Sequence, residues 1–214
     1  MPRSVTASWA LIAEWLAANL PAAMAVVQAP ASAEQIAQVE AAMERPLPAD
    51  MVEWLRLADG MHWQTRHGSL LPTLHNPMGC EEILSHRDML HSVYGRRPRP
   101  EDNDPAGTPV GEWLDAFLPM GNAIIGLTLF LDLRDGSRYG GVCEWDPEAG
   151  GFVDEPRWDS VAHLFAEVAD ALTTGAPVMS AYAAGGRGPG DRLPAMIPDL
   201  SDPDYLSWEG ELGT

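Results

Sequence analysis

The side chains best suited to chemistry gather in one stretch of the chain. Cys80 and all but one of the histidines lie there, the histidines being His62, His67, His75, His86 and His91. A zinc site needs three or four ligands that converge, commonly two histidines four residues apart on one helix. His86 and His91 are five residues apart, which turns them roughly 140° away from each other on a helix. The spacing favours scattered surface histidines, and it predicts no metal or other cofactor.

The two cysteines are weak candidates for nucleophilic catalysis. Cys80 falls near a predicted helix start, where the helix dipole can lower the pKa of a thiol. The adjacent Glu81 and Glu82 oppose a thiolate, however, and Cys143 falls inside a predicted strand. We therefore expect both cysteines to be small structural residues.

Two pairs of carboxylates could divide acid and base roles if their environments separated their pKa values. These pairs are Asp132 with Asp135, and Asp154 with Glu155. All four are predicted at turns, where acids are ordinarily solvated. The glycine-rich run at 184–188 lacks the preceding strand, the lysine and the following helix of a phosphate loop. The sequence therefore predicts no catalytic residue.

The spacing of apolar residues predicts four helices in the first half of the chain and one near its end. They cover about 8–20, 32–43, 47–60 and 79–94, and the last begins at Asp159 or Ser160. After Trp113 the pattern becomes typical of strands, over 123–132, 139–146 and 152–153. This order predicts an α+β fold, with a mainly antiparallel meander packed with about five helices.

Each predicted helix carries an apolar stripe that should face the core. Ser32 and Gln35 form a capping box at the start of the second helix. The stripes comprise Trp9, Ile12 and Leu16; Ile36, Val39 and Met43; Met51, Trp54, Leu55 and Ala58; Ile83, Leu84, Leu90 and Val93; and Val161, Leu164, Phe165, Val168 and Leu172.

The length of 214 residues suits a single core. We assign residues 1–177 to one α+β domain that contains a mobile surface loop at about 96–111. Residues 178–214 are rich in Gly, Pro and acids, which is typical of an extended arm.

The net charge limits the partners. Its formal value of −18 comes from 31 acidic against 13 basic side chains. Such a field repels nucleic acid and anionic membranes and steers a basic protein toward the chain, although it also serves solubility alone. The chain has only two cysteines, and Trp9, Glu14 and Trp15 interrupt its apolar N-terminus, so we expect a cytoplasmic protein without a signal peptide or membrane span.

Trp63 follows a helix stop within a polar loop. An exposed Trp among acids is typical of an interface anchor, and the alternative is that Trp63 folds back over the edge of the sheet. The predicted partner-binding surface joins this aromatic residue to an acidic rim and comprises Trp63, Glu101, Asp102, Asp104, Asp154 and Glu155.

Several short sequence motifs over roughly residues 7–176 follow one another in the order typical of a known family. They are an acidic helix pair, the segments 45–50 and 57–60, the segment 113–120 before the strands, the hairpin 131–145 and the closing amphipathic helix. In this order the chain resembles the SUKH superfamily, in the branch named for the fungal Smi/Knr cell-wall-assembly regulators. The loop at 96–111 and the tail after Pro177 extend beyond the family pattern. The matching residues are structural, so no binding residue carries over.

The resemblance implies an α+β fold without enzymatic activity, and in bacteria an immunity protein that binds and neutralises a toxin domain, often a nuclease. The acidic composition independently favours a basic protein partner. We therefore expect a non-catalytic immunity module. Two alternatives stay open: a regulatory or signalling adaptor without a toxin partner, and a metal-dependent enzyme that uses the stretch from His62 to His91.

Overall fold

The computed structural model describes residues 2–62, 67–95, 100–123, 126–147, 151–152, 156–179, 195–202 and 204–210, with the backbone alone at 100–101 and 151–152. The helices within these ranges are α1 (Val5–Asn19), α2 (Pro21–Met24), α3 (Ala33–Met43), α4 (Ala49–Leu55), α5 (Cys80–Tyr94) and α6 (Val161–Thr174), with a short 3-10 helix η1 (Pro100–Asn103). None of these helices is long and apolar enough to cross a membrane.

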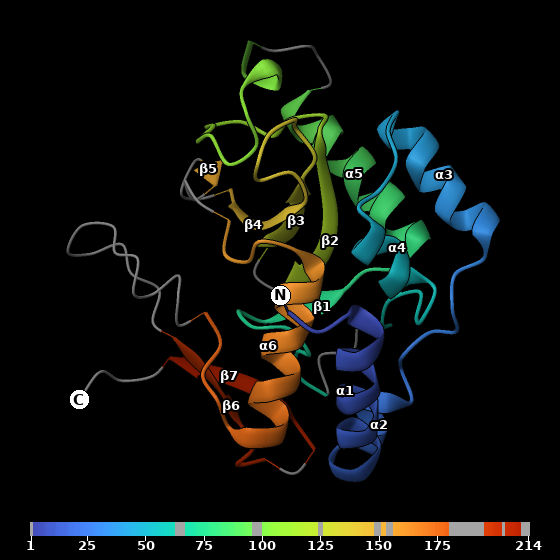
Figure 1. Cartoon of the computed structure of the whole chain (residues 1–214), viewed down its shortest axis with the longest axis vertical. Coiled ribbons are helices and arrows are strands. Elements are labelled where there is room, and N and C mark those ends of the chain that lie inside the picture. The colour runs from blue at the N-terminus through green and yellow to red at the C-terminus, as the bar shows by residue number, and fades with distance from the viewer. Residues whose placement is uncertain are drawn as a thin grey trace.

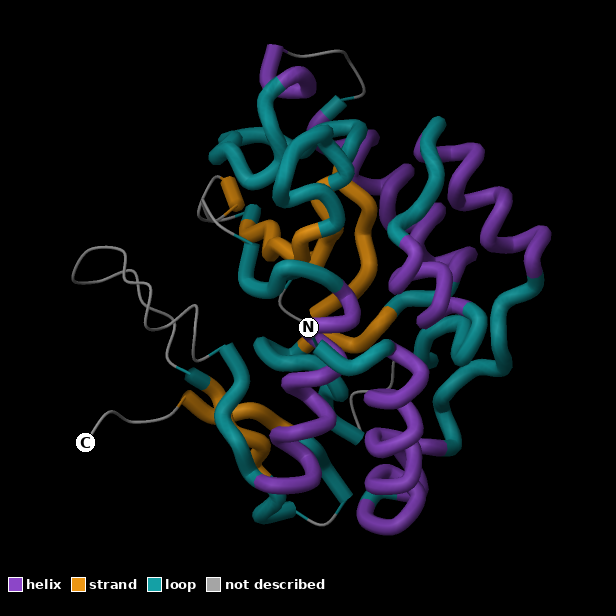
Figure 2. Tube along the Cα trace, in the orientation of Figure 1, coloured by secondary structure: helices purple, strands orange, loops and turns teal. Residues whose placement is uncertain are grey.

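The main sheet is an antiparallel meander in which each strand pairs with the next along the chain (Figures 1 and 2). Its strands are β1 (His75–Pro77), β2 (Phe117–Ala123), β3 (Thr128–Asp132), β4 (Gly141–Asp146) and β5 (Gly151–Phe152). A separate hairpin joins β6 (Met196–Asp199) to β7 (Ser207–Gly210). The predicted α+β fold with a meander is confirmed.

Side-chain caps fix the starts of three helices. The Ser32 hydroxyl accepts from Gln35 N while the Gln35 side chain accepts from Ser32 N, which confirms the predicted capping box. Ser4 caps α1 and Ser160 caps α6 through the hydroxyl alone, which accepts from the backbone N–H three residues further on. Each cap satisfies a backbone N–H that has no partner inside its helix.

The main sheet carries an apolar cluster on each face. Phe130 of β3 packs with Trp113 and Trp145 in one cluster, while its neighbours Leu129 and Leu131 belong to the larger one. Successive side chains of a strand point to opposite faces, so a strand covered on both sides is apolar throughout. This explains why all five residues of β3 are buried.

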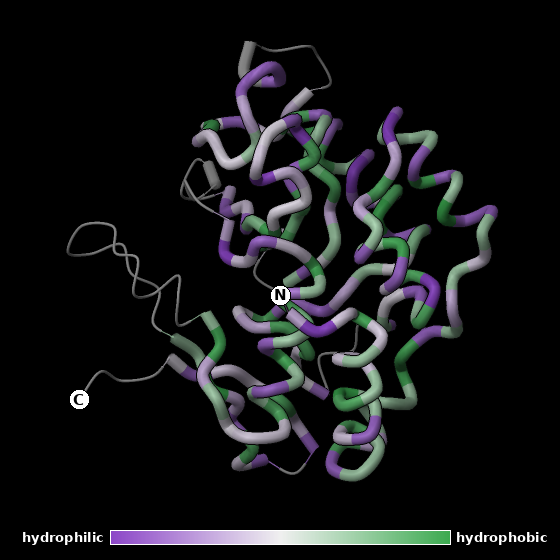
Figure 3. Tube along the Cα trace, in the orientation of Figure 1, coloured by the Kyte–Doolittle hydropathy of each residue, from purple (hydrophilic) through white to green (hydrophobic). Residues whose placement is uncertain are grey.

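The larger cluster joins the sheet to α1, α4 and α6. The Trp54 ring lies 5.0 Å from that of Trp9 and 4.6 Å from that of Phe165. Figure 3 shows hydrophobic and hydrophilic residues alternating along α3, as expected of a helix with one buried face. Fully burying one such aromatic or aliphatic side chain contributes about 1.5–3 kcal/mol.

The structure differs from the sequence predictions at several places, and neither α2 nor the strands β6 and β7 were predicted. β1 was not predicted, and the apolar run 123–132 contains the last residue of β2 and the whole of β3 rather than one strand. Val93, predicted to face inward, is 64% exposed, because α5 turns Ile83, Arg87 and Leu90 toward the protein instead.

The predicted mobile surface loop at about 96–111 and the predicted C-terminal arm both contribute buried residues. Leu206 and Trp208 lie in the larger cluster, and Trp208 Nε1 donates to the Ser69 carbonyl at 3.0 Å. In the predicted loop at 96–111, Ala106 and Val110 are buried. The hairpin β6–β7 is therefore packed against the rest of the protein.

Candidate functional site

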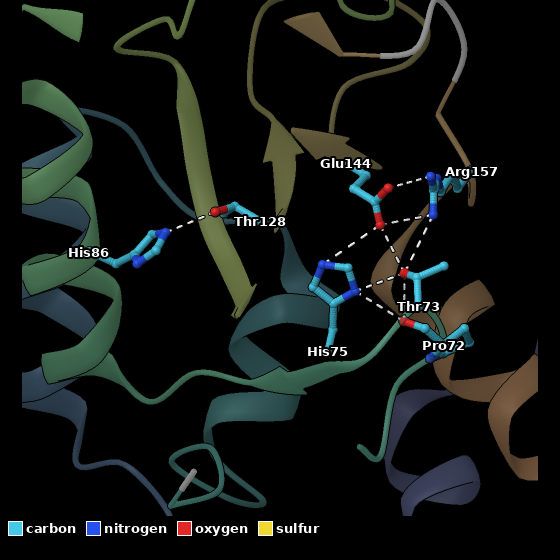
Figure 4. Close-up of polar contacts among 7 residues, drawn as sticks. All are labelled: Pro72, Thr73, His75, His86, Thr128, Glu144 and Arg157. Atoms are coloured by element: carbon cyan, nitrogen blue, oxygen red, sulfur yellow. Dashed lines mark hydrogen bonds and ion pairs between the residues drawn. The ribbon is translucent and has the colours of Figure 1, made fainter. Parts of the chain in front are cut away.

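A buried polar network joins β1 to β4 (Figure 4). Arg157 binds the Glu144 carboxylate through both terminal nitrogens, with Nη1 2.9 Å from Oε2. The Thr73 hydroxyl lies 2.8 Å from the same Oε2. His75 Nδ1 lies 3.0 Å from the Pro72 carbonyl, and its Nε2 lies 3.7 Å from Glu144 Oε2. Thr73 is held at a φ of 58°, which brings its hydroxyl into this network.

The network combines residue types used in acid–base catalysis, but it is closed to substrate. His75 is fully buried and Glu144 is 6% exposed. Burial lowers the pKa of His75 to about 3, so the ring is neutral at physiological pH. Burial also raises the pKa of Glu144, against the opposing effect of Arg157. The arrangement positions the loop before β1 against β4, and we assign it a structural role.

The remaining histidines do not converge on it. His86 lies on α5, away from His75 on β1, and its Nε2 is 2.9 Å from Thr128 Oγ1 (Figure 4). His91 Nε2 lies 3.0 Å from Asp115, while His62 is exposed. In the described part of the chain no three His, Cys, Asp or Glu residues gather as a metal site would require. The prediction of scattered surface histidines is wrong for His75, which is fully buried beside Glu144, and for His91, whose side chain is only 8% exposed.

Both cysteines are buried and free of disulfides, as the structural role predicted for them requires. Burial, followed by the nearby Asp59 carboxylate, raises the pKa of Cys80 to about 12. Burial also raises the pKa of Cys143. Neither thiol forms the thiolate that nucleophilic catalysis needs.

The prediction that Asp132 is a solvated residue at a turn is wrong. Asp132 is fully buried and pairs with Arg134, whose Nη2 lies 2.7 Å from Oδ2. The same carboxylate accepts from Gly107 N at 2.8 Å, so it anchors the preceding loop to the end of β3. Asp135 is exposed at the turn, as predicted. The pair therefore does not form an acid–base site.

The predicted partner-binding surface falls largely outside what the structure describes. Trp63, Asp154 and Glu155 lie outside the described residues, and Glu101 lies in η1 with only its backbone described. The remaining two, Asp102 and Asp104, are half-buried. This surface therefore stays a prediction.

A surface that the sequence predictions missed lies along α5, which packs against β2 and α3 (Figure 1). We call Glu81, Glu82, His86, Met89 and Val93 the α5 face. The last four stand at i, i+4, i+7 and i+11, so they form one stripe of the helix.

Two hollows adjoin the α5 face. An apolar groove of about 400 Å³ lies beside its C-terminal half and is lined by residues that include Met89, Val93 and Trp145. A polar hollow of about 380 Å³ lies beside its N-terminal half, where Glu81 and Glu82 contribute to the lining. The helical stripe was visible in the sequence, but its exposure depends on which neighbours cover α5.

Five of the arginines in the described part of the chain are buried or paired with acids, while Arg56 is exposed. The sequence contains no lysine, so arginines supply all 13 of its Lys and Arg residues. Arg87, Arg134 and Arg157 are buried. Arg3 and Arg138 each pair with a surface carboxylate, at 2.7 and 3.2 Å. These five arginines therefore compensate few of the acids that face solvent.

Comparison with known proteins gives one family. Residues 30–168, well over half of the chain, match the SMI1 / KNR4 family (SUKH-1). No curated protein matches the chain significantly.

Proposed function

We propose that this chain, which belongs to the SMI1 / KNR4 family (SUKH-1), is a non-catalytic immunity protein that binds and neutralises a basic toxin domain. The proposal places it in the cytoplasm, a reducing compartment that suits its two free, buried cysteines. A nuclease is the favoured class of toxin, because surfaces that bind nucleic acid carry basic charge.

The observation that carries the proposal is the disposition of charge. The chain has a formal charge of −18, and five of its arginines are buried or paired with acids. A cationic partner is drawn to such a surface, which raises the rate of association and disfavours acidic partners. Blocking a toxin requires fast and selective capture, and this charge supplies both.

The interior supports a binding role over catalysis. The acid–base residues His75 and Glu144 are sealed from solvent, and the pKa of Cys80 is raised rather than lowered. A catalytic group must reach the substrate atom that it acts on. In the described part of the chain these side chains are buried instead, and they contribute to the packing of the fold.

Co-expression tests the proposal. A toxin domain encoded beside this chain should stop growth when expressed alone, and co-expression of this chain should restore it. The purified pair should bind, and the affinity should fall at least tenfold between 50 and 300 mM salt, because salt screens charges at the rim of an interface. Growth arrest that persists despite full expression of the chain would refute the immunity role. Tight binding to a different, non-toxic protein would favour the regulatory adaptor.

A further inference from the structure

The C-terminal half of the α5 face exposes apolar side chains. Met89 is 44% exposed and Val93 is 64% exposed, the highest value among the large exposed hydrophobic residues of the described chain. They stand one helical turn apart beside the groove, whose lining includes the buried Leu90 and Trp145. Paired exposed apolar residues beside a groove are typical of a surface that a partner covers.

The N-terminal half of the α5 face is acidic. Glu81 and Glu82 occupy the first turn of α5, and Asp88 is exposed further along the same helix. The helix contains one arginine, Arg87, which is buried. Its outward side therefore presents the exposed carboxylates of Glu81 and Asp88, and the half-buried Glu82 lines the polar hollow together with Glu81.

The acidic half is held in place by the preceding loop. Asp59 Oδ1 accepts from Cys80 N at 2.6 Å, and Asp59 Oδ2 accepts from the Gln35 side chain at 3.0 Å. A Cβ on Gly60 would come within 2.2 Å of Gly79 N, so the loop touches the start of α5 directly. These contacts fix the backbone that carries Glu81 and Glu82, and a fixed backbone lowers the entropy cost of binding.

We propose that the α5 face is the surface that docks the partner, and that it takes a segment carrying a large apolar side chain and a cluster of Arg or Lys. This assignment rests on the proposed function. The apolar side chain enters the groove at Met89 and Val93, and the cations lie over Glu81 and Glu82. Eleven residues of helix separate Glu82 from Val93, so the two parts of the segment stand about 16 Å apart.

Charge sets the orientation of the segment and disfavours another copy of this chain as the occupant. Carboxylates predominate at the start of α5, at Glu81 and Glu82. The sequence after α5 is basic instead, with Arg96, Arg97 and Arg99 outside the described residues. A second copy would bring its own Glu81 and Glu82 to a surface that already carries these acids. A cationic segment meets opposite charge there instead.

Binding of the full-length chain to the toxin domain encoded beside it tests the assignment. Val93→Arg introduces a better helix former than Val and suits the helix C-terminus, while it places a charge at the rim of the groove. We expect it to raise Kd at least tenfold, which corresponds to about 1.4 kcal/mol. Leu200→Arg is the matched control, since Leu200 is a large apolar residue, 48% exposed, outside the α5 face. It should change Kd less than threefold.

A second pair of variants tests the charge. The double reversal Glu81→Lys and Glu82→Lys should raise Kd at least tenfold and make its dependence on salt shallower. Glu14→Lys, at an exposed position on α1, is the control and should have less than a threefold effect. Circular dichroism should show that every variant melts as the wild type does.

Each outcome decides the assignment. If the wild type binds and both α5 variants bind equally well, the α5 face is wrong while the immunity role stands. If the wild type fails to bind the toxin domain, both proposals fall. If sedimentation shows that Val93→Arg dissociates a dimer while toxin binding is unchanged, the face is a contact between copies and the assignment is overturned.

Discussion

Replacing His75 should flatten the dependence of stability on pH. The folded protein keeps this ring neutral because burial lowers its pKa to about 3, whereas an unfolded chain takes up the proton near its ordinary pKa of 6.5. Unfolding therefore binds a proton below pH 6.5, and stability falls as the pH drops. Above pH 6.5 the full stability is present, and the loss continues down to about pH 3.

The size of this effect follows from the two pKa values. One pKa unit corresponds to about 1.36 kcal/mol, so between pH 7.5 and 5.5 the ring removes about 1.4 kcal/mol from the free energy of unfolding. The lowered pKa of His86 adds a loss of the same sign, and the raised pKa of Glu144 acts in the opposite direction. Comparing the wild type with His75→Gln isolates the His75 contribution, because both proteins retain the other two groups.

Urea unfolding, followed by tryptophan fluorescence at pH 7.5, 6.5 and 5.5, measures the effect. His75→Gln should be less stable at pH 7.5, since it disturbs the contacts with Pro72 and Thr73, but it should lose about 1.4 kcal/mol less on acidification. The same replacement at the exposed His62 should keep the wild-type dependence. Equal slopes for wild type and His75→Gln would show that the ring is not held neutral.

Three further predictions concern the buried ion pair, the contact at Gly60 and the sequence-predicted surface. Glu144→Gln should cost about 3–5 kcal/mol in urea unfolding, because it leaves Arg157 charged and buried, while replacing both by Met should recover most of the loss; equal costs would refute the pairing argument. Gly60→Ala should cost at least twice the roughly 1–2 kcal/mol of Gly175→Ala, since both need a positive φ but only Gly60 touches other backbone. A smaller cost at Gly60 would contradict that contact. Reversing Glu101, Asp102 and Asp104 to Lys should weaken toxin binding and its salt dependence if they belong to the interface, and unchanged calorimetric affinity would discard them.

Local sequence signals predicted the helices well. The capping box at Ser32 and the apolar stripe from Val161 to Leu172 involve residues within a few turns of each other, so spacing alone specifies them. The same holds for the turn that follows β3, where Asp135 is exposed as predicted.

The features that residue spacing did not predict depend on contacts between residues far apart in the chain. β1 has three residues and ends in Pro77, so it gains its strand conformation by pairing with β2. The burial of His75 depends on Glu144, far along the chain. Val93 fits the apolar stripe of α5 by type, but its exposure follows from the neighbours that cover other sides of the helix. The α5 face was missed for this reason.

The core crosses the limits of the family match. Trp9, Ile12 and Leu16 precede residue 30, while Leu206 and Trp208 come after residue 168, yet all five are buried in the larger cluster. A fragment cut at the family limits would lack α1, which packs against α6, and would expose the face of Trp54 that contacts Trp9. The packed core is thus wider than the stretch by which relatives are identified, and an expressed fragment should retain both flanks.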